Sequence, residues 1–142
     1  MYSNQATPLE MTPEEMNRLL HKVTYGHIAL AFENEAYVVP VSFVYDDSLI
    51  WFHVPRQGKV TTYLQANSQA CFQLDELCGD QWGSVICYGT ATLSDSLESK
   101  RQFISLTEQR EPSDDELQMM DAYICSLSID EMTGRRTPDY SA

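Results

Sequence analysis

Apolar and polar positions follow a helical period near the start of the chain. Thr12-Pro13-Glu14-Glu15 has the residues of a helix N-terminus, with a capping residue, an early proline and a glutamate that closes a capping box. Apolar residues then recur at helical spacing, at Met16, Leu19, Leu20 and Val23. The pattern predicts an amphipathic helix that ends near Tyr25-Gly26, after a loose polar lead-in over residues 1–11.

From His27 the period changes to two, which is typical of strands. A strand over 27–32 and a second over 36–45 flank the polar turn Glu33-Asn34-Glu35, so a hairpin is expected. The second strand is apolar on both faces. We therefore expect a barrel interior on one side of it and a subunit partner or a ligand on the other. Pro40 cannot donate to a ladder, which marks an edge or a bulge and leaves nearby backbone groups free to meet a ligand.

The rest of the chain continues the mainly β pattern and then turns helical. The expected elements are a strand over 49–54, a helix after Gly58, a strand over 69–74, an acidic loop over 75–81, a strand over 82–93, helices capped at Asp95 and Ser113, and a final strand over 125–129. The odd positions of the fifth strand, such as Gly89 and Ala91, are small, as a narrow barrel interior requires. The pattern predicts a small β-barrel with helices around it, in one domain spanning 1–142.

Composition excludes several classes of partner. The formal net charge is −12 over 142 residues, so neither nucleic acid nor an anionic membrane surface is an expected partner. No apolar run reaches membrane-spanning length and no secretory signal opens the chain, so we expect a cytoplasmic protein. The four cysteines form no C-x-x-C pair and the three histidines are scattered, so no metal site is predicted.

One loop stands out by its charge. Arg56 and Lys59 are the only formal charges between Ser48 and Leu74, and they precede a predicted helix. A glycine, a lysine and the free N–H groups of a helix N-terminus can form a binding site for a phosphate or a carboxylate. The alternative is that both cations are ordinary solvated loop residues.

No nucleophile, metalloprotease or phosphate-loop motif is present. His53, at the end of a strand beside the cationic loop, is the single candidate for a chemical role. The alternative is that His53 is a structural histidine held by hydrogen bonds. His21 is expected at the surface.

The order of short motifs resembles that of the pyridoxamine 5'-phosphate oxidase-like flavin-binding split barrels, in the branch that includes the nitroimidazole-resistance proteins. The resemblance covers roughly residues 11 to 136. Its motifs are Pro40-Val41-Ser42-Phe43, Phe52-His53, Gly58-Lys59, Leu64-Gln65-Ala66-Asn67, Ala70-Cys71-Phe72, Trp82-Gly83-Ser84-Val85 with Gly89, and the ending Ile129 to Arg135.

The resemblance implies a mainly β (α+β) fold, a six-stranded antiparallel split β-barrel of the Greek-key type with peripheral helices. It implies a homodimer with FMN in grooves between the subunits. The phosphate would sit at Gly58 and Lys59. The strand Pro40, Val41, Ser42, Phe43 would lie along the isoalloxazine ring. Trp82 and Ser84 would come from a neighbouring strand, as part of the same subunit or of the partner.

The chain departs from the family pattern at its cations and at one hydroxyl. The loop reads Gly58-Lys59-Val60 where a further basic residue is usual, and Arg56 is the candidate to replace it. His53 and Val54 are also expected at the cofactor, but Val54 stands where a Thr or Ser is common, and the stretch 64–69 lacks two arginines. Weak FMN binding, or a deazaflavin or haem in place of FMN, is therefore an alternative.

The functional hypothesis is an FMN-binding oxidoreductase that reduces a small organic substrate with electrons from a nicotinamide nucleotide or another donor, with His53 as a substrate-side hydrogen-bond donor. The competing hypothesis is a non-catalytic dimer that stores or senses a flavin, a deazaflavin or haem. A third is a barrel that holds no phosphate-bearing cofactor at all.

Overall fold

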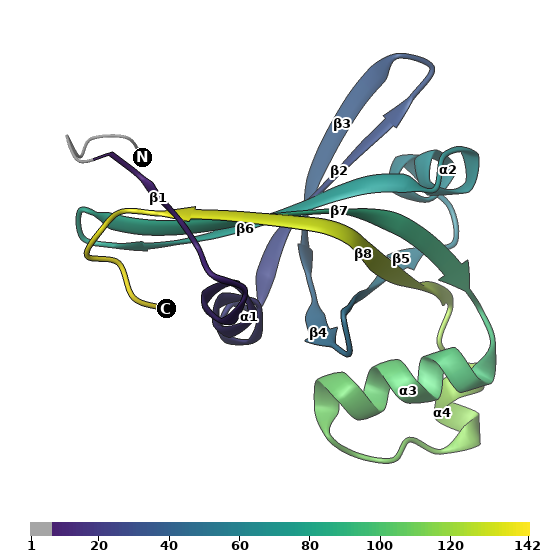
Figure 1. Ribbon diagram of the computed structural model, residues 1–142. Coiled ribbons are helices and arrows are strands. Elements are labelled where there is room, and N and C mark those ends of the chain that lie inside the picture. Colours follow the sequence, from purple (N-terminus) through teal and green to yellow (C-terminus); the bar gives the residue numbers. More distant parts are fainter. Residues whose placement is uncertain (1–6) are drawn as a thin grey trace.

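A computed structural model describes residues 7–142 as one twisted antiparallel sheet with four peripheral helices (Figure 1). The strands are β1 (Leu9–Glu10), β2 (Tyr25–Phe32), β3 (Glu35–Ser42), β4 (Val44–Asp46), β5 (Leu49–Pro55), β6 (Gln69–Cys78), β7 (Gln81–Ser94) and β8 (Ala122–Arg136). The helices are α1 (Pro13–Lys22), α2 (Lys59–Ala66), α3 (Leu97–Glu108) and α4 (Asp114–Gln118). The sheet runs in the order β3-β2-β6-β7-β8-β5-β4, and β1 pairs with β8.

The antiparallel sheet with peripheral helices confirms the predicted split-barrel class, although it has eight strands rather than six and is not closed. Phe43 interrupts the predicted second strand, which gives β3 and β4 on opposite edges of the sheet. The other extra strand, β1, pairs Leu9 and Glu10 with the end of β8. Residues 9–11 of the expected lead-in are therefore paired or packed, and residues 1–6 of it lie outside the described part.

Other boundaries also differ from the sequence prediction. The predicted acidic loop over 75–81 is wrong, because β6 and β7 continue to a two-residue turn and Glu76 is neutralised there by Lys22 at 3.0 Å. The cap of α3 is Ser96 rather than Asp95, since the Ser96 hydroxyl accepts from the Ser99 N–H. The last strand, β8, is far longer than the predicted 125–129, because it already begins at Ala122 and continues to Arg136.

The first helix and the first strand meet earlier than predicted. The helix α1 ends at Lys22 rather than near Tyr25-Gly26, and β2 already begins at Tyr25. The capping box at Thr12 and Glu15 is present as expected. The ring of His21 is exposed, which confirms its predicted surface position.

Two apolar clusters hold the sheet and the helices together. The larger lies under α1 and α2 and includes the buried odd positions of β7, so the prediction of a small inner face there is confirmed. The smaller joins α3 and α4 to the far end of the sheet, and its buried members are Trp51, Phe103, Ile104, Leu117 and Ile124. The second cluster fixes α3 beside β4 and β5, which matters for the cavity described below.

Candidate functional site

The strand β3 is an edge strand, paired only with β2 within the described residues 7–142. The Phe43 N–H donates to the Thr24 carbonyl at 3.1 Å, so the odd positions of this strand direct their backbone groups toward β2. Positions 38, 40 and 42 therefore turn their backbone groups to the open edge. Pro40, which lacks an N–H, stands at one of them and removes no bond from the ladder. The prediction that Pro40 marks an edge is confirmed.

Lys59 lies at the start of α2 and is held there by acidic and aromatic neighbours. Gly58, the N-cap, has a φ of 137°, a conformation that favours glycine. The Lys59 Nζ donates to Glu35 Oε1 at 3.1 Å and lies 4.6 Å from the centre of the Tyr37 ring. The hydrogen bond to Glu35 raises the pKa of Lys59, and the same bond lowers the pKa of Glu35. A cation is thus fixed beside the free N–H groups of a helix that has no acidic residue in its first turn.

Arg56 leaves the same loop in another direction. Its Nε donates to Asp121 at 2.6 Å and its Nη1 donates to Asp95 at 3.3 Å. Its guanidinium also lies 5.2 Å from the Tyr123 ring centre. The hydrogen bonds to the two carboxylates raise the pKa of Arg56. The structure therefore does not bring Arg56 and Lys59 together as one anion-binding site.

Three candidate residues, Ser42, Phe43 and His53, line one cavity of about 490 Å³. We call it the α3 cavity. Its other lining residues are Thr24, Val44, Phe103, Leu106, Thr107 and Glu108. His53 is exposed, with its ring centre 5.7 Å from that of Phe103. The cavity thus joins the end of β3 and the middle of β5 to one face of α3.

Trp82 and Ser84 lie elsewhere, in a cavity of about 130 Å³ that Arg135 also lines. In the sheet, β7 is separated from β3 by β2 and β6. Within one chain the structure therefore does not bring Trp82 or Ser84 to the α3 cavity. Trp82 is 2% exposed in a single chain, although it belongs to neither apolar cluster.

One face of the sheet carries uncharged side chains that are exposed or half-buried, and none of them belongs to the apolar clusters formed by the described residues. Strand register aligns Val38, Ala29, Cys71 and Tyr88 in a row across four strands. Val38 is 58% and Tyr88 46% exposed. A neighbouring row holds Pro40, His27, Gln73 and Ile86. We call these eight residues the outer face.

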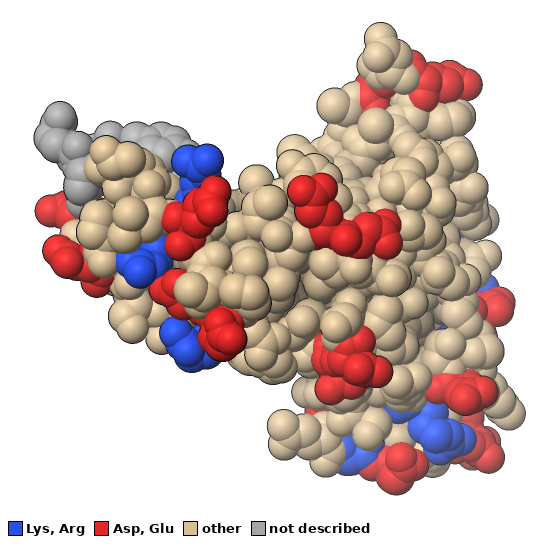
Figure 2. Space-filling view, in the orientation of Figure 1, with Lys and Arg blue, Asp and Glu red and all other residues tan. Residues whose placement is uncertain are grey.

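Charge is distributed unevenly over the rest of the surface. Figure 2 shows one face of the molecule, on which basic side chains gather at the left, near the N-terminus, and at the lower right, near α3 and α4. Acidic side chains lie in both places and also across the middle. The surface thus follows the acidic net charge of −12.

Sequence comparison identifies the family. The family model described as pyridoxamine 5'-phosphate oxidase matches residues 12–136. The chain belongs to the pyridoxamine 5'-phosphate oxidase family. No curated protein matches its sequence.

Solved structures share the fold of this family member. A FAD-binding protein from Mesorhizobium loti is 24% identical, with a TM-score of 0.77, over 92% of this chain and 98% of that one. A proposed 5-nitroimidazole antibiotic resistance protein from Bacteroides thetaiotaomicron is 17% identical, with a TM-score of 0.80, over 94% of this chain and 89% of that one. A FAD- and haem-binding protein from Mycobacterium smegmatis is 16% identical, with a TM-score of 0.75, over 92% of this chain and 74% of that one. At these identities the likeness shows the fold.

Two predicted site residues of this family member have inward side chains. Val54 is 3% exposed and packs in the core, and Val41 is half-buried against it. Neither side chain is therefore placed to meet a ligand, and the backbone groups of Val41 point toward β2. The α3 wall of the cavity was not predictable from the sequence, because the apolar spacing of Phe103 and Leu106 shows that α3 packs but not which strand it covers.

The described residues show neither a metal-ligand cluster nor a membrane-spanning helix. Within residues 7–142, no three His, Cys, Asp or Glu side chains converge as metal ligands would. No helix in the same range has both the length and the apolar content to span a membrane. The four cysteines are free thiols, and burial raises the pKa of Cys87 and of Cys125 to about 12.

Proposed function

We propose that the protein is a homodimeric, FMN-binding oxidoreductase that reduces a small organic substrate with electrons from a nicotinamide nucleotide. The observation that carries this proposal is the open edge of β3, where the N–H groups of positions 38 and 42 and the carbonyl groups of positions 38, 40 and 42 face outward. A flat ring with a polar edge, such as isoalloxazine, matches an alternating row of donors and acceptors. Family membership and the FAD-binding relatives support the same cofactor class.

The helix start at Gly58 and Lys59 fits a phosphate. The first N–H groups of α2 have no partner within the helix, and the glycine presents no side chain over them. The Lys59–Glu35 pair is solvent-exposed at 49% and 63%, and such pairs are weak, so a phosphate can share the lysine. Arg56 contributes no second cation in this arrangement. We expect FMN affinity to depend on Lys59 and the helix N-terminus.

A second copy of the chain would complete the site. Trp82 and Ser84 lie far from the α3 cavity in the strand order, whereas the outer face is uncharged and uncovered. Uncovered apolar patches of this kind mark interaction sites. Pairing two chains through the outer face is the arrangement we propose for bringing Trp82 and Ser84 of one subunit toward the cofactor of the other.

In this proposal FMN supplies the electron-transfer chemistry when bound. The residues of the chain bind the cofactor, orient it and the substrate, and shield the cavity from water. The open edge of β3 orients the ring, and Lys59 holds the phosphate. His53, in the α3 cavity, donates a hydrogen bond to the substrate at an imidazole nitrogen. Phe43 and Phe103 exclude water from the cavity wall.

The alternative is a non-catalytic flavin-, deazaflavin- or haem-binding dimer, which the FAD- and haem-binding relative from Mycobacterium smegmatis supports. The visible spectrum of freshly purified protein, before and after addition of FMN and desalting, tests the cofactor. A retained two-peaked flavin spectrum is expected. Consumption of NADH or NADPH with a panel of acceptors tests catalysis, and a rate no higher than that of free FMN would contradict the oxidoreductase proposal.

A further inference from the structure

The α3 cavity has aromatic and aliphatic walls. Phe43 and Phe103 are 8% and 9% exposed and thus largely buried, and Leu106 and Val44 are partly buried beside them. The cavity volume of about 490 Å³ lies within the range of roughly 300–1,000 Å³ that small-molecule sites occupy. Its shape and walls therefore suit a small aromatic compound.

The polar groups of the cavity are mainly acceptors or neutral donors. Thr24 and Ser42 contribute hydroxyls. The Thr107 hydroxyl donates to the Phe103 carbonyl at 2.9 Å, which leaves its oxygen free to accept from a ligand. His53 adds an imidazole. No lysine or arginine is among the lining residues.

The end of α3 adds negative potential. Leu106, Thr107 and Glu108 form the last turn of a twelve-residue helix, and no basic residue stands in that turn. The free carbonyl groups of a helix C-terminus carry a partial negative charge. This potential opposes an anion in the cavity and favours a cation or a hydrogen-bond donor.

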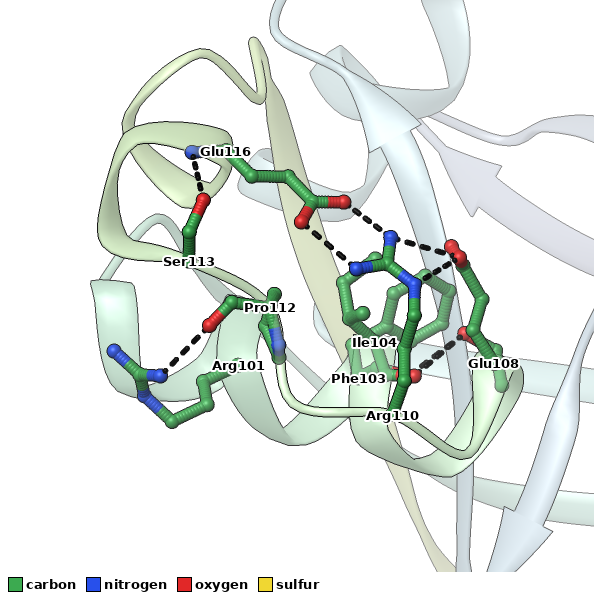
Figure 3. A network of polar contacts seen from close by, with 9 residues as sticks. Arg101, Phe103, Ile104, Glu108, Arg110, Pro112, Ser113 and Glu116 are labelled. Atoms are coloured by element: carbon green, nitrogen blue, oxygen red, sulfur yellow. Dashed lines mark hydrogen bonds and ion pairs between the residues drawn. The ribbon is translucent and has the colours of Figure 1, made fainter.

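Glu108 brings a carboxylate to the same cavity. Arg110 Nε donates to Glu108 at 2.9 Å, but Arg110 also pairs with both oxygens of Glu116 (Figure 3). The hydrogen bond to Glu116 is the main reason that the pKa of Arg110 is raised. One guanidinium thus serves two carboxylates, so this cluster carries net negative charge beside the cavity.

We propose that the α3 cavity is the substrate site and that it selects neutral or cationic aromatic compounds and rejects anions, including phosphate esters and carboxylates. This inference rests on the proposed function, since it names the substrate class of that site. The phosphorylated substrate in the name of the family is thus not the expected one here. The anion of the cofactor is bound elsewhere, at Lys59, so a cofactor phosphate and an anion-rejecting substrate site are compatible.

The test uses benzamide, benzylamine and benzoate, which share one ring and are neutral, cationic and anionic at pH 8. Their dissociation constants are measured by ligand-observed NMR on the full chain, as purified and after addition of FMN. Benzamide and benzylamine are expected to bind, and benzoate at least tenfold more weakly. Leu106→Arg places a cation on the cavity wall and should reverse that order.

The matched control is Leu97→Arg, the same substitution on the first residue of α3, where the side chain is 41% exposed. It should leave the order of the three compounds unchanged. Equal binding of benzoate, no binding of any of the three, or an equal reversal by Leu97→Arg would overturn the inference. A protein that retains no flavin but keeps the charge preference would contradict the proposed function alone, because the cavity belongs to one chain.

Discussion

Lys59 and Arg56 are neighbours in sequence with different surroundings, and this difference gives a prediction at the scale of single residues. Lys59 stands at the N-terminus of α2 beside one carboxylate, whereas Arg56 is held by Asp95 and Asp121. Lys59→Ala should weaken FMN binding by about tenfold, since it removes a charged hydrogen bond to the phosphate. Flavin fluorescence titration measures the change.

The matched control is Arg56→Ala, which removes a cation from the same loop. We expect FMN affinity to stay within about twofold of the parent. A larger loss in Arg56→Ala than in Lys59→Ala would place the phosphate on the other side of the loop and would contradict the assignment to Gly58 and Lys59.

Substitutions at Ser42 test whether the open edge of β3 binds the flavin. The Ser42 N–H points away from β2, so Ser42→Pro removes a donor from the proposed flavin contact without breaking the β2–β3 ladder. FMN affinity should fall roughly three- to tenfold, the size of one neutral hydrogen bond. Ser42→Ala keeps the N–H and should bind as the parent does. Equal loss in both variants would assign the effect to the hydroxyl.

At the scale of elements, Glu15 links the start of α1 to the end of β8. It accepts from the Thr12 N–H at 2.9 Å and pairs with Arg136 at 2.6 Å. The Thr12 backbone bond, followed by Arg136, lowers its pKa below 4.5. The folded state therefore gains stability above pH 4.5 and loses it as the pH falls through the lowered pKa.

Glu15→Gln should remove part of this pH dependence. Between pH 6 and pH 3 the free energy of unfolding should fall by about 0.2–1 kcal/mol less in the variant than in the parent. Urea unfolding at each pH measures it. Glu14→Gln, on an exposed neighbour in the same turn, is the control and should follow the parent. Identical curves for Glu15→Gln and the parent would show that the pair with Arg136 does not stabilise the fold.

The elements also show what the sequence could predict. Local signals placed α1, the β2–β3 hairpin and β5, because capping residues and period-two alternation act over a few neighbours. The division at Phe43 and the length of β8 depend on pairing with distant strands, for which the local sequence has no signal. The same limit applies to the site. Ser42 and His53 could be singled out, whereas Glu108 reaches their cavity only because the Phe103 cluster docks α3 beside β5.

At the scale of the whole molecule, the uncharged outer face leads to the prediction that two chains pair as a homodimer. A stable dimer buries about 800 Å² on each partner, and the outer face spans four strands with no charged side chain in its two rows. Light scattering coupled to gel filtration should give twice the 16.2 kDa of one chain. Ala29→Arg, which places a charge in the middle of a row, should give the monomer.

The dimer and the cofactor are coupled in this proposal, so the same variant tests both. If Ser84 of one subunit meets the flavin of the other, monomeric Ala29→Arg should also lose most of its retained FMN, although Lys59 and the β3 edge are intact. The control Gln65→Arg adds the same charge on the exposed side of α2 and should remain a dimer with its flavin. A monomer that keeps parental FMN affinity would show that one chain holds the entire cofactor site.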